Sequence, residues 1–227
     1  MSHFPNTRRV RSIACLCAGL LSWQFAAARG LEVVVDGAGD AAVVVALYAA
    51  DGAALGVAAR DRTTHVVDQV NKRFVPALTA ITVGDAVSFP NSDDIRHHVY
   101  SFSPAKTFEL PLYHGVPTAP VDFDVAGKVV LGCNIHDSMA ATIYVLDTAA
   151  HTLTVDGIAR FPTLAAGDYR VVIHHPRQVN DDGVRRFAVH VDADAPARLD
   201  IGISLAPPPA PELSALEARF KALRDEP

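Results

Sequence analysis

The sequence has few sulfur-containing residues and no excess of basic charge. Its 227 residues include three cysteines, two methionines and one tryptophan, and 20 Lys and Arg against 25 Asp and Glu give a net charge of −5. So few cysteines exclude a disulfide-rich scaffold, and the acidic balance excludes the basic footprint of a nucleic-acid-binding protein. Half of the residues are hydrophobic and 20% are charged, which excludes a disordered or collagen-like chain.

The first 28 residues have the features of a secretory signal peptide. Arg8, Arg9 and Arg11 precede the uncharged and largely apolar segment 12–28, which ends in three alanines. A basic start, a short apolar run and small residues at a cleavage site are typical of such peptides, and the run is too short for a transmembrane anchor. We therefore expect cleavage near Ala28 and a periplasmic mature protein without a transmembrane anchor.

Cleavage would change the net charge of the chain and the number of its sulfur-containing residues. It removes three arginines and no acidic residue, so 17 basic residues would face 25 acidic ones, a net charge of −8. It also leaves one cysteine, Cys133, and one methionine, Met139. A single thiol cannot form an internal disulfide, so Cys133 is a buried side chain, an intermolecular link, or a reactive or metal-binding thiolate.

The mature chain is predicted to be all-β. Short Val- and Ile-rich segments alternate with Gly, Pro, Asn and Asp, which favours a sandwich or barrel. The alternation in residues 121–125 predicts that Val121, Phe123 and Val125 share a buried face. Strands are expected over residues 31–35, 42–48, 79–89 with a turn at Gly84-Asp85, 98–102, 121–125, 128–131 and 142–146, and then over 152–155, 169–173, 187–191 and 199–205.

These segments fall into two blocks and a tail. We expect a first β domain over residues 29–148, a small β-sandwich over 149–205, and a Pro-rich linker with an amphipathic helical tail over 206–227. The helical spacing rests on Leu213, Leu216, Phe220 and Leu223.

A candidate metal site lies in the segment Cys133-Asn-Ile-His136-Asp-Ser-Met139. It falls between two predicted strands, so its side chains can converge, and a histidine from Arg96-His97-His98-Val99 would complete a set of two imidazoles, a thiolate and a thioether. That set suits copper that cycles between Cu(I) and Cu(II), because soft sulfur stabilises Cu(I) and imidazole tolerates both states.

Other interpretations of these residues stay open. Zinc would accept Cys133 and two histidines, with Glu109 or Asp137 in place of the thioether, which is a poor zinc ligand. A nucleophilic Cys133 with a histidine partner would leave Met139 unexplained. His174-His175, in the second block, is expected to be a surface pair at a strand end or an accessory metal site.

Several motifs together resemble the cupredoxins. They are Val87-Ser-Phe-Pro-Asn91, His97-His-Val99, Phe123 to Gly127, the Cys133 to Met139 loop and the strand Thr142 to Val145. The short loop is most similar to that of the amicyanins, whose likeness covers about residues 80–146. Four further segments are Phe74-Val-Pro76, His97 to Phe102, Ala105 to Tyr113 and Leu131 to Asp137. Through them the chain resembles, over about residues 31–205, periplasmic proteins labelled methylamine utilization protein. Residues 154–171 are similar to the small transthyretin-like or carboxypeptidase-regulatory sandwiches.

The resemblance implies a cupredoxin-like Greek-key sandwich with one type 1 copper ion. Cys133 would be the thiolate ligand, His97 and His136 the imidazoles, and Met139 the axial thioether. Many cupredoxins have Asn after the first ligand histidine, where it ties the ligand loops together. Here His98 occupies that position and is the second choice for the ligand, because only one of two adjacent extended side chains can face the site.

The implied function is that of a one-electron carrier, not an enzyme. A periplasmic dehydrogenase or cytochrome would be its redox partner. A copper-binding or delivery module without an electron-transfer role is the alternative, although the mature chain lacks the Met-rich tract expected of such a module.

Overall fold

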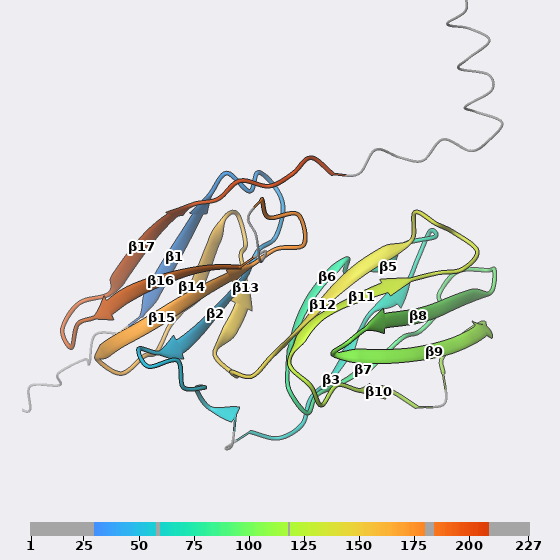
Figure 1. Ribbon diagram of the computed structural model, residues 1–227, viewed down its shortest axis with the longest axis horizontal. Helices are drawn as coiled ribbons and strands as arrows, with labels where there is room; N and C mark the ends of the chain where they lie inside the picture. Colours follow the sequence, from blue (N-terminus) through green and yellow to red (C-terminus); the bar gives the residue numbers. More distant parts are fainter. Residues whose placement is uncertain (1–29, 58–59, 118, 180–183, 209–227) are drawn as a thin grey trace, which may run out of the picture.

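Two β-sandwiches lie side by side along the long axis of the molecule (Figure 1). The computed structural model describes residues 30–57, 60–117, 119–179 and 184–208, and within these ranges it contains strands and turns but no α-helix. The prediction of an all-β protein is confirmed. The expected signal peptide and helical tail lie outside the described residues.

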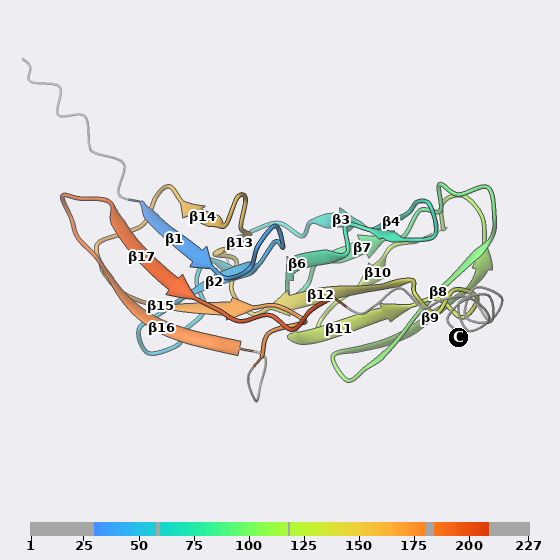
Figure 2. The same cartoon turned by 90° about the horizontal axis from the view of Figure 1, so that it is seen from above.

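The central sandwich comprises the strands between residues 64 and 146. These strands are β3 (Thr64–Val66), β4 (Asp68–Gln69), β5 (Phe74–Val75), β6 (Leu78–Thr82), β7 (Ala86–Ser88), β8 (His97–Ser103), β9 (Lys106–Tyr113), β10 (Val121–Asp122), β11 (Gly127–Gly132) and β12 (Ala140–Leu146). One sheet has the order β6-β12-β11-β8-β9, the other has the order β10-β7-β3, and β4 pairs with β5. Figure 2 shows the two layers, with β3 and β7 on one side and β11 and β12 on the other.

The flanking sandwich combines both ends of the described chain. Its strands are β1 (Leu31–Asp36), β2 (Val44–Ala49), β13 (His151–Leu153), β14 (Ile158–Phe161), β15 (Gly167–His174), β16 (Val184–Val191) and β17 (Ala197–Gly202). The sheet β14-β1-β17 faces the sheet β13-β2-β15-β16. Period-two burial on β1, where Leu31, Val33 and Val35 point inward, supplies part of a core separate from that of the central sandwich.

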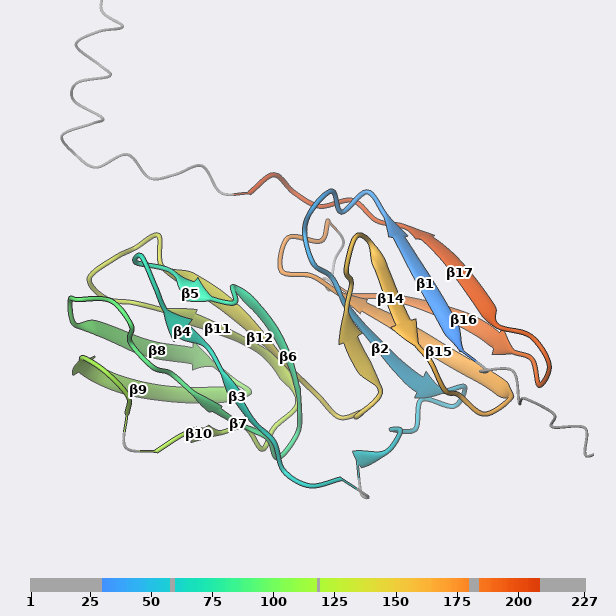
Figure 3. The same ribbon diagram turned by 180° about the vertical axis from the view of Figure 1, so that it is seen from behind.

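The strand pairing differs from the division expected from the sequence. Residues 29–148 were expected to form one domain, but β1 pairs with β14 and β17, and β2 pairs with β13 and β15. The chain therefore starts the flanking sandwich, leaves it after β2 to build the central sandwich, and returns at β13 (Figure 3). Periodicity showed where strands form but carried no information on their distant partners.

A third apolar cluster joins the two sandwiches. It contains Ala80, Tyr144 and Leu146 of the central sandwich together with Val44, Ala46 and Val172 of the flanking sandwich. A polar contact of 3.1 Å links Thr82 Oγ1 to His151 Nε2 across the same junction. The central sandwich is thus packed against its neighbour as well as being connected to it by the chain.

Some local predictions were wrong. Val125 is 57% exposed rather than buried, because β10 ends at Asp122 and the alternation does not continue as a strand. His175 is buried rather than at the surface. Strands β3, β4, β5, β9 and β14 were not predicted, and most of them are short or half-exposed. No helix in the described ranges is long and apolar enough to cross a membrane.

Candidate metal centre

The strands β8 and β11 position two of the predicted ligands, His97 and Cys133, in the core. On β11, Val129 and Leu131 point inward, and the next inward position, Cys133, falls just beyond the strand end. On β8 the inward positions are His97, Val99 and Ser101, all fully buried. Strand alternation therefore brings Cys133 and His97 to the same end of the central sandwich.

The loop between β11 and β12 supplies the other two predicted ligands. A backbone hydrogen bond of 2.9 Å from Met139 N–H to the His136 carbonyl closes a turn within it. Met139 is 1% exposed and belongs to the same core cluster as Cys133, whereas His136 is half-buried. The loop thus directs its methionine into the core and leaves one histidine at the edge.

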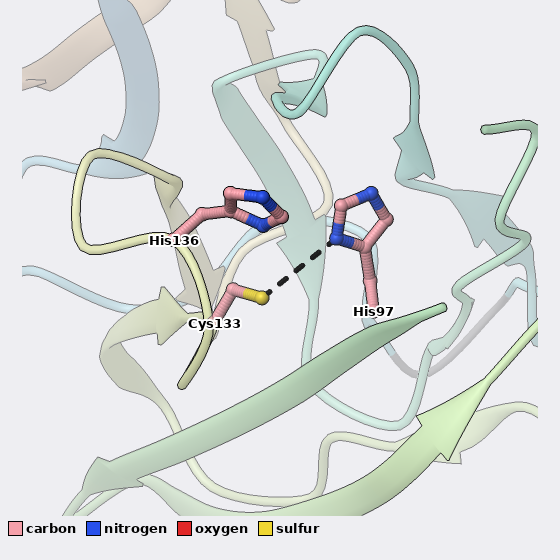
Figure 4. Close-up of side chains that lie close together, drawn as sticks. All are labelled: His97, Cys133 and His136. Carbon is pink, nitrogen blue, oxygen red and sulfur yellow. Dashed lines mark hydrogen bonds between the residues drawn. The ribbon is translucent and has the colours of Figure 1, made fainter. Parts of the chain in front are cut away.

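Three of the four side chains meet at one point (Figure 4). The potential ligand atoms of His97, Cys133 and His136 all lie within 4.8 Å of one another. His97 Nδ1 is 3.9 Å from Cys133 Sγ, and the rings of His97 and His136 have centroids 5.0 Å apart. Among the described residues this is the group whose donor atoms are close enough to hold a metal ion together, and neither Glu109 nor Asp137 joins it.

Hydrogen bonding fixes which nitrogen of His97 faces the cluster. Its Nε2 lies 2.6 Å from Asp93 Oδ2, and because an ionised carboxylate only accepts hydrogen bonds, Nε2 carries the proton. The lone pair of the neutral ring is then on Nδ1, the atom that points toward Cys133 Sγ. His97 therefore presents Nδ1, and not Nε2, to Cys133.

His136 also has an available nitrogen. Its Nδ1 is buried and has no hydrogen-bond partner in the described part of the chain. Burial lowers the pKa of His136, electrostatic interactions with His97 and Lys72 lower it further, and the interaction with Asp93 raises it. A buried imidazole nitrogen without a hydrogen-bond partner is available to bind a metal ion.

His98 faces away from the cluster. Its Nε2 pairs with Glu109 Oε1 at 2.8 Å, and its ring lies 5.6 Å from that of Tyr100 on the outer face of β8. Of the two adjacent histidines, His97 is thus the one beside Cys133. The same pairing holds Glu109 on the opposite face from the cluster, away from the position that a zinc ligand would need.

Two residues near the cluster went unassigned in the sequence. Asn91 is buried and donates through Nδ2 to the carbonyls of Ile95 and Tyr113, at 2.9 and 2.8 Å, while its Oδ1 accepts the Asp93 N–H. It ties the loop before β8 to the end of β9. For Asp93, nothing in the sequence indicated a contact with His97 except its position four residues earlier.

The donor set determines which metals fit. Two imidazoles, a buried thiolate and a buried thioether match the preferences of copper, and the thioether disfavours zinc. The core position of Cys133 and Met139 excludes bulk water from the sulfur side. The residues present therefore fit a copper ion.

Comparisons with known proteins give partial similarities. No family model and no curated protein matches the sequence. Similar solved structures include a copper-containing nitrite reductase from Thermus scotoductus SA-01, at 26% identity over 41% of this chain and 24% of the reductase chain, with a TM-score of 0.36. Pseudoazurin from Methylobacterium extorquens AM1 is 26% identical over 37% of this chain and 76% of its own, with a TM-score of 0.31.

A reduced mutant of amicyanin is 19% identical over 40% of this chain and 90% of its own, with a TM-score of 0.34. These neighbours are cupredoxins, and none of these three matches extends beyond 41% of the present chain. The metal centre is inferred from the distances, burial and hydrogen bonds of its own residues and not from these matches.

Proposed function

We propose that the protein is a periplasmic one-electron carrier with a single type 1 copper ion. The observation that carries the proposal is the cluster of His97, Cys133 and His136, whose donor atoms lie within 4.8 Å of one another, beside the buried Met139. In this arrangement Cys133 would bind as the thiolate, the two histidines through Nδ1, and Met139 as a weak axial ligand.

Rigid placement of these side chains suits electron transfer. A copper ion bound here would supply the Cu(II)/Cu(I) couple. The protein holds His97 by its contact with Asp93, and it holds Cys133 and Met139 by burial in the core. Ligands that are fixed before and after a redox change need little rearrangement, because a packed core resists displacement.

His136 is the proposed route for electrons to and from the surface. It is half-buried, whereas Cys133 and His97 have at most 3% of their surface exposed. The side chain beside it, Ile135, is 49% exposed and apolar. A partner protein that docks at this loop would therefore approach the centre most closely through the His136 ring.

Spectra of the copper-reconstituted protein test the ligand set. The protein lacking residues 1–28 is expected to show a visible thiolate-to-copper absorption and a type 1 paramagnetic-resonance signal. Cys133→Ser removes the thiolate and should abolish the visible band. Met139→Leu is the matched control, because it should retain copper and the band while shifting the reduction potential.

Two results would contradict the proposed centre. An unchanged spectrum in Cys133→Ser would show that the thiolate is not a ligand, and a complete loss of copper binding in Met139→Leu would contradict an axial role. Stoichiometry separates the carrier from the delivery module, since a carrier holds one tightly bound copper and a delivery protein holds labile or multiple copper ions.

The partner and the compartment are part of the proposal. A periplasmic dehydrogenase or cytochrome is the proposed redox partner, and export rests on the signal-peptide features of residues 1–28. If the acidic residues of the mature chain, with its charge of −8, gather on one face, they favour a basic docking surface on that partner and a salt-sensitive association rate.

A further inference from the structure

Asp93 contacts a predicted copper ligand from outside the ligand set. Its Oδ2 accepts a hydrogen bond of 2.6 Å from His97 Nε2, on the side of the ring opposite the atom that faces Cys133. The carboxylate side chain is 11% exposed and the imidazole is fully buried. Little water is available to replace this contact.

The backbone of a neighbouring turn holds the carboxylate in place. The amides of Asn71 and Lys72 both donate to Asp93, and both residues have positive φ values, 54° and 59°. That left-handed backbone turns two successive N–H groups toward one anion. Asp93 therefore has a second anchor that is independent of His97.

We propose that Asp93 is a positioning residue that selects the Nδ1-ligand form of His97 and lowers the reduction potential of the bound copper. This inference rests on the proposed copper centre. A carboxylate that accepts the Nε2 proton fixes the tautomer and ring orientation and makes the imidazole a stronger donor. A stronger donor stabilises Cu(II) relative to Cu(I), because the more highly charged ion gains more from it.

The first test uses the metal-free protein. Nitrogen NMR of the imidazoles, with resonances assigned through His97→Gln, should show His97 protonated at Nε2 and not at Nδ1. The opposite tautomer in the native protein would overturn the proposal.

The second test compares Asp93→Asn with a matched variant. In Asp93→Asn the side chain loses its charge and one acceptor oxygen, so we expect the preference for Cu(II) over Cu(I) to fall by about tenfold, which equals the lower end of the effect that loss of such a partner has on metal affinity. For a one-electron couple a tenfold change corresponds to a potential about 59 mV higher. Asp68→Asn is the control, because Asp68 contacts Ser92 and Gln69 rather than a histidine and the charge change is the same.

The outcomes separate this inference from the proposed function. A raised potential in Asp93→Asn, with no comparable change in Asp68→Asn, supports the positioning role. Equal potentials in Asp93→Asn and the native protein, with type 1 spectra in both, would overturn the role of Asp93 and leave the copper centre intact. A native protein without type 1 spectra would instead contradict the centre itself.

Discussion

Burial of the donor atoms of His97 and His136 costs free energy unless a hydrogen-bond partner or a metal ion contacts them. His136 Nδ1 is buried without a hydrogen-bond partner in the described residues, and His97 Nδ1 lies 3.9 Å from the thiol of Cys133. Buried polar atoms in native proteins are nearly always satisfied, and those that are not call for an explanation. A metal ion that accepts both lone pairs and the thiolate satisfies all three side chains at once.

His175, a buried histidine outside the metal centre, leads to a prediction about the pH dependence of stability. Burial lowers the pKa of His175 to about 4, and the positive charges of Arg177 and Lys128 contribute. Since its ordinary value is 6.5, the unfolded chain takes up a proton before the folded protein does as the pH falls. The stability linked to His175 is therefore fully present above about pH 6.5 and is lost as the pH falls toward 4.

His175→Asn should reduce this pH dependence. The Asn side-chain oxygen can accept the Arg177 N–H that His175 Nδ1 accepts at 3.1 Å, but it does not titrate in this range. Urea midpoints measured at pH 7.5 and pH 5 should fall less in the variant than in the native protein. Equal falls in both would mean that other groups carry the acid sensitivity.

At the residue scale, the sequence predicted a metal centre from residue types that are rare in this chain. It could not predict roles that depend on where the fold places a side chain. One cysteine and one methionine close to His136 pointed to a metal centre before any fold was known. The choice between His97 and His98 depends on which face of β8 each occupies, a question of strand phase that the sequence left open. Asp93 could not be predicted, because its role comes from a turn more than 20 residues earlier.

At the scale of elements, close packing between β8 and β11 positions the cysteine. Gly132 precedes Cys133 and pairs with Tyr100 across the two strands. A Cβ atom at Gly132 would lie 2.6 Å from Cζ and 2.7 Å from Oη of the Tyr100 ring. The glycine is thus required by a close approach of an aromatic ring to the backbone beside the predicted thiolate ligand.

Gly132→Ala should therefore destabilise the protein and disturb the centre. Overpacking of this kind costs about 1–3 kcal/mol, and the displaced strand end should shift the visible band of the copper-loaded protein. Urea unfolding and absorption spectra measure both effects. The double variant Gly132→Ala/Tyr100→Ala, compared with Tyr100→Ala alone, should recover most of the loss, and an undiminished penalty would place the strain elsewhere.

Strand prediction was most successful for segments rich in buried apolar residues. Residues 31–35, which alternate in burial, and residues 142–146, which are all buried, match β1 and β12. The edge strand β9 was missed, because an edge strand with alternately exposed residues has no continuous apolar run. The buried face expected at Val125 fails for the converse reason, since alternation alone does not supply a pairing partner for residues beyond Asp122.

At the scale of the whole molecule, one sandwich is inserted into the other. β1 runs parallel to β17, so Leu31 lies opposite Ala197, and β2 lies between β13 and β15. The central sandwich, in contrast, has all of its paired strands between residues 64 and 146. The strands of the two sandwiches have the same sequence periodicity, so periodicity does not show to which sandwich a strand belongs. For this reason the expected boundary near residue 148 separated β1 and β2 from their partners.

This topology predicts opposite outcomes for two truncations. Removal of residues 149–227 strips β1 and β2 of every partner and exposes their apolar faces, so the shortened chain should aggregate or bind hydrophobic dye. A fragment of residues 60–148 keeps all strands of the central sandwich and should fold and bind copper with weakened stability, because the junction cluster is lost. A well-folded chain without residues 149–227, together with an unfolded fragment 60–148, would contradict the assignment of β1 and β2 to the flanking sandwich.

The most direct test of the electron-carrier account is a reductive titration of the copper-loaded protein, followed by its visible band. The account predicts one copper per chain, complete bleaching by one electron per chain, and full recovery of the band on reoxidation. Loss of copper during the cycle, more than one copper per chain, or a colourless Cu(II) protein would contradict it.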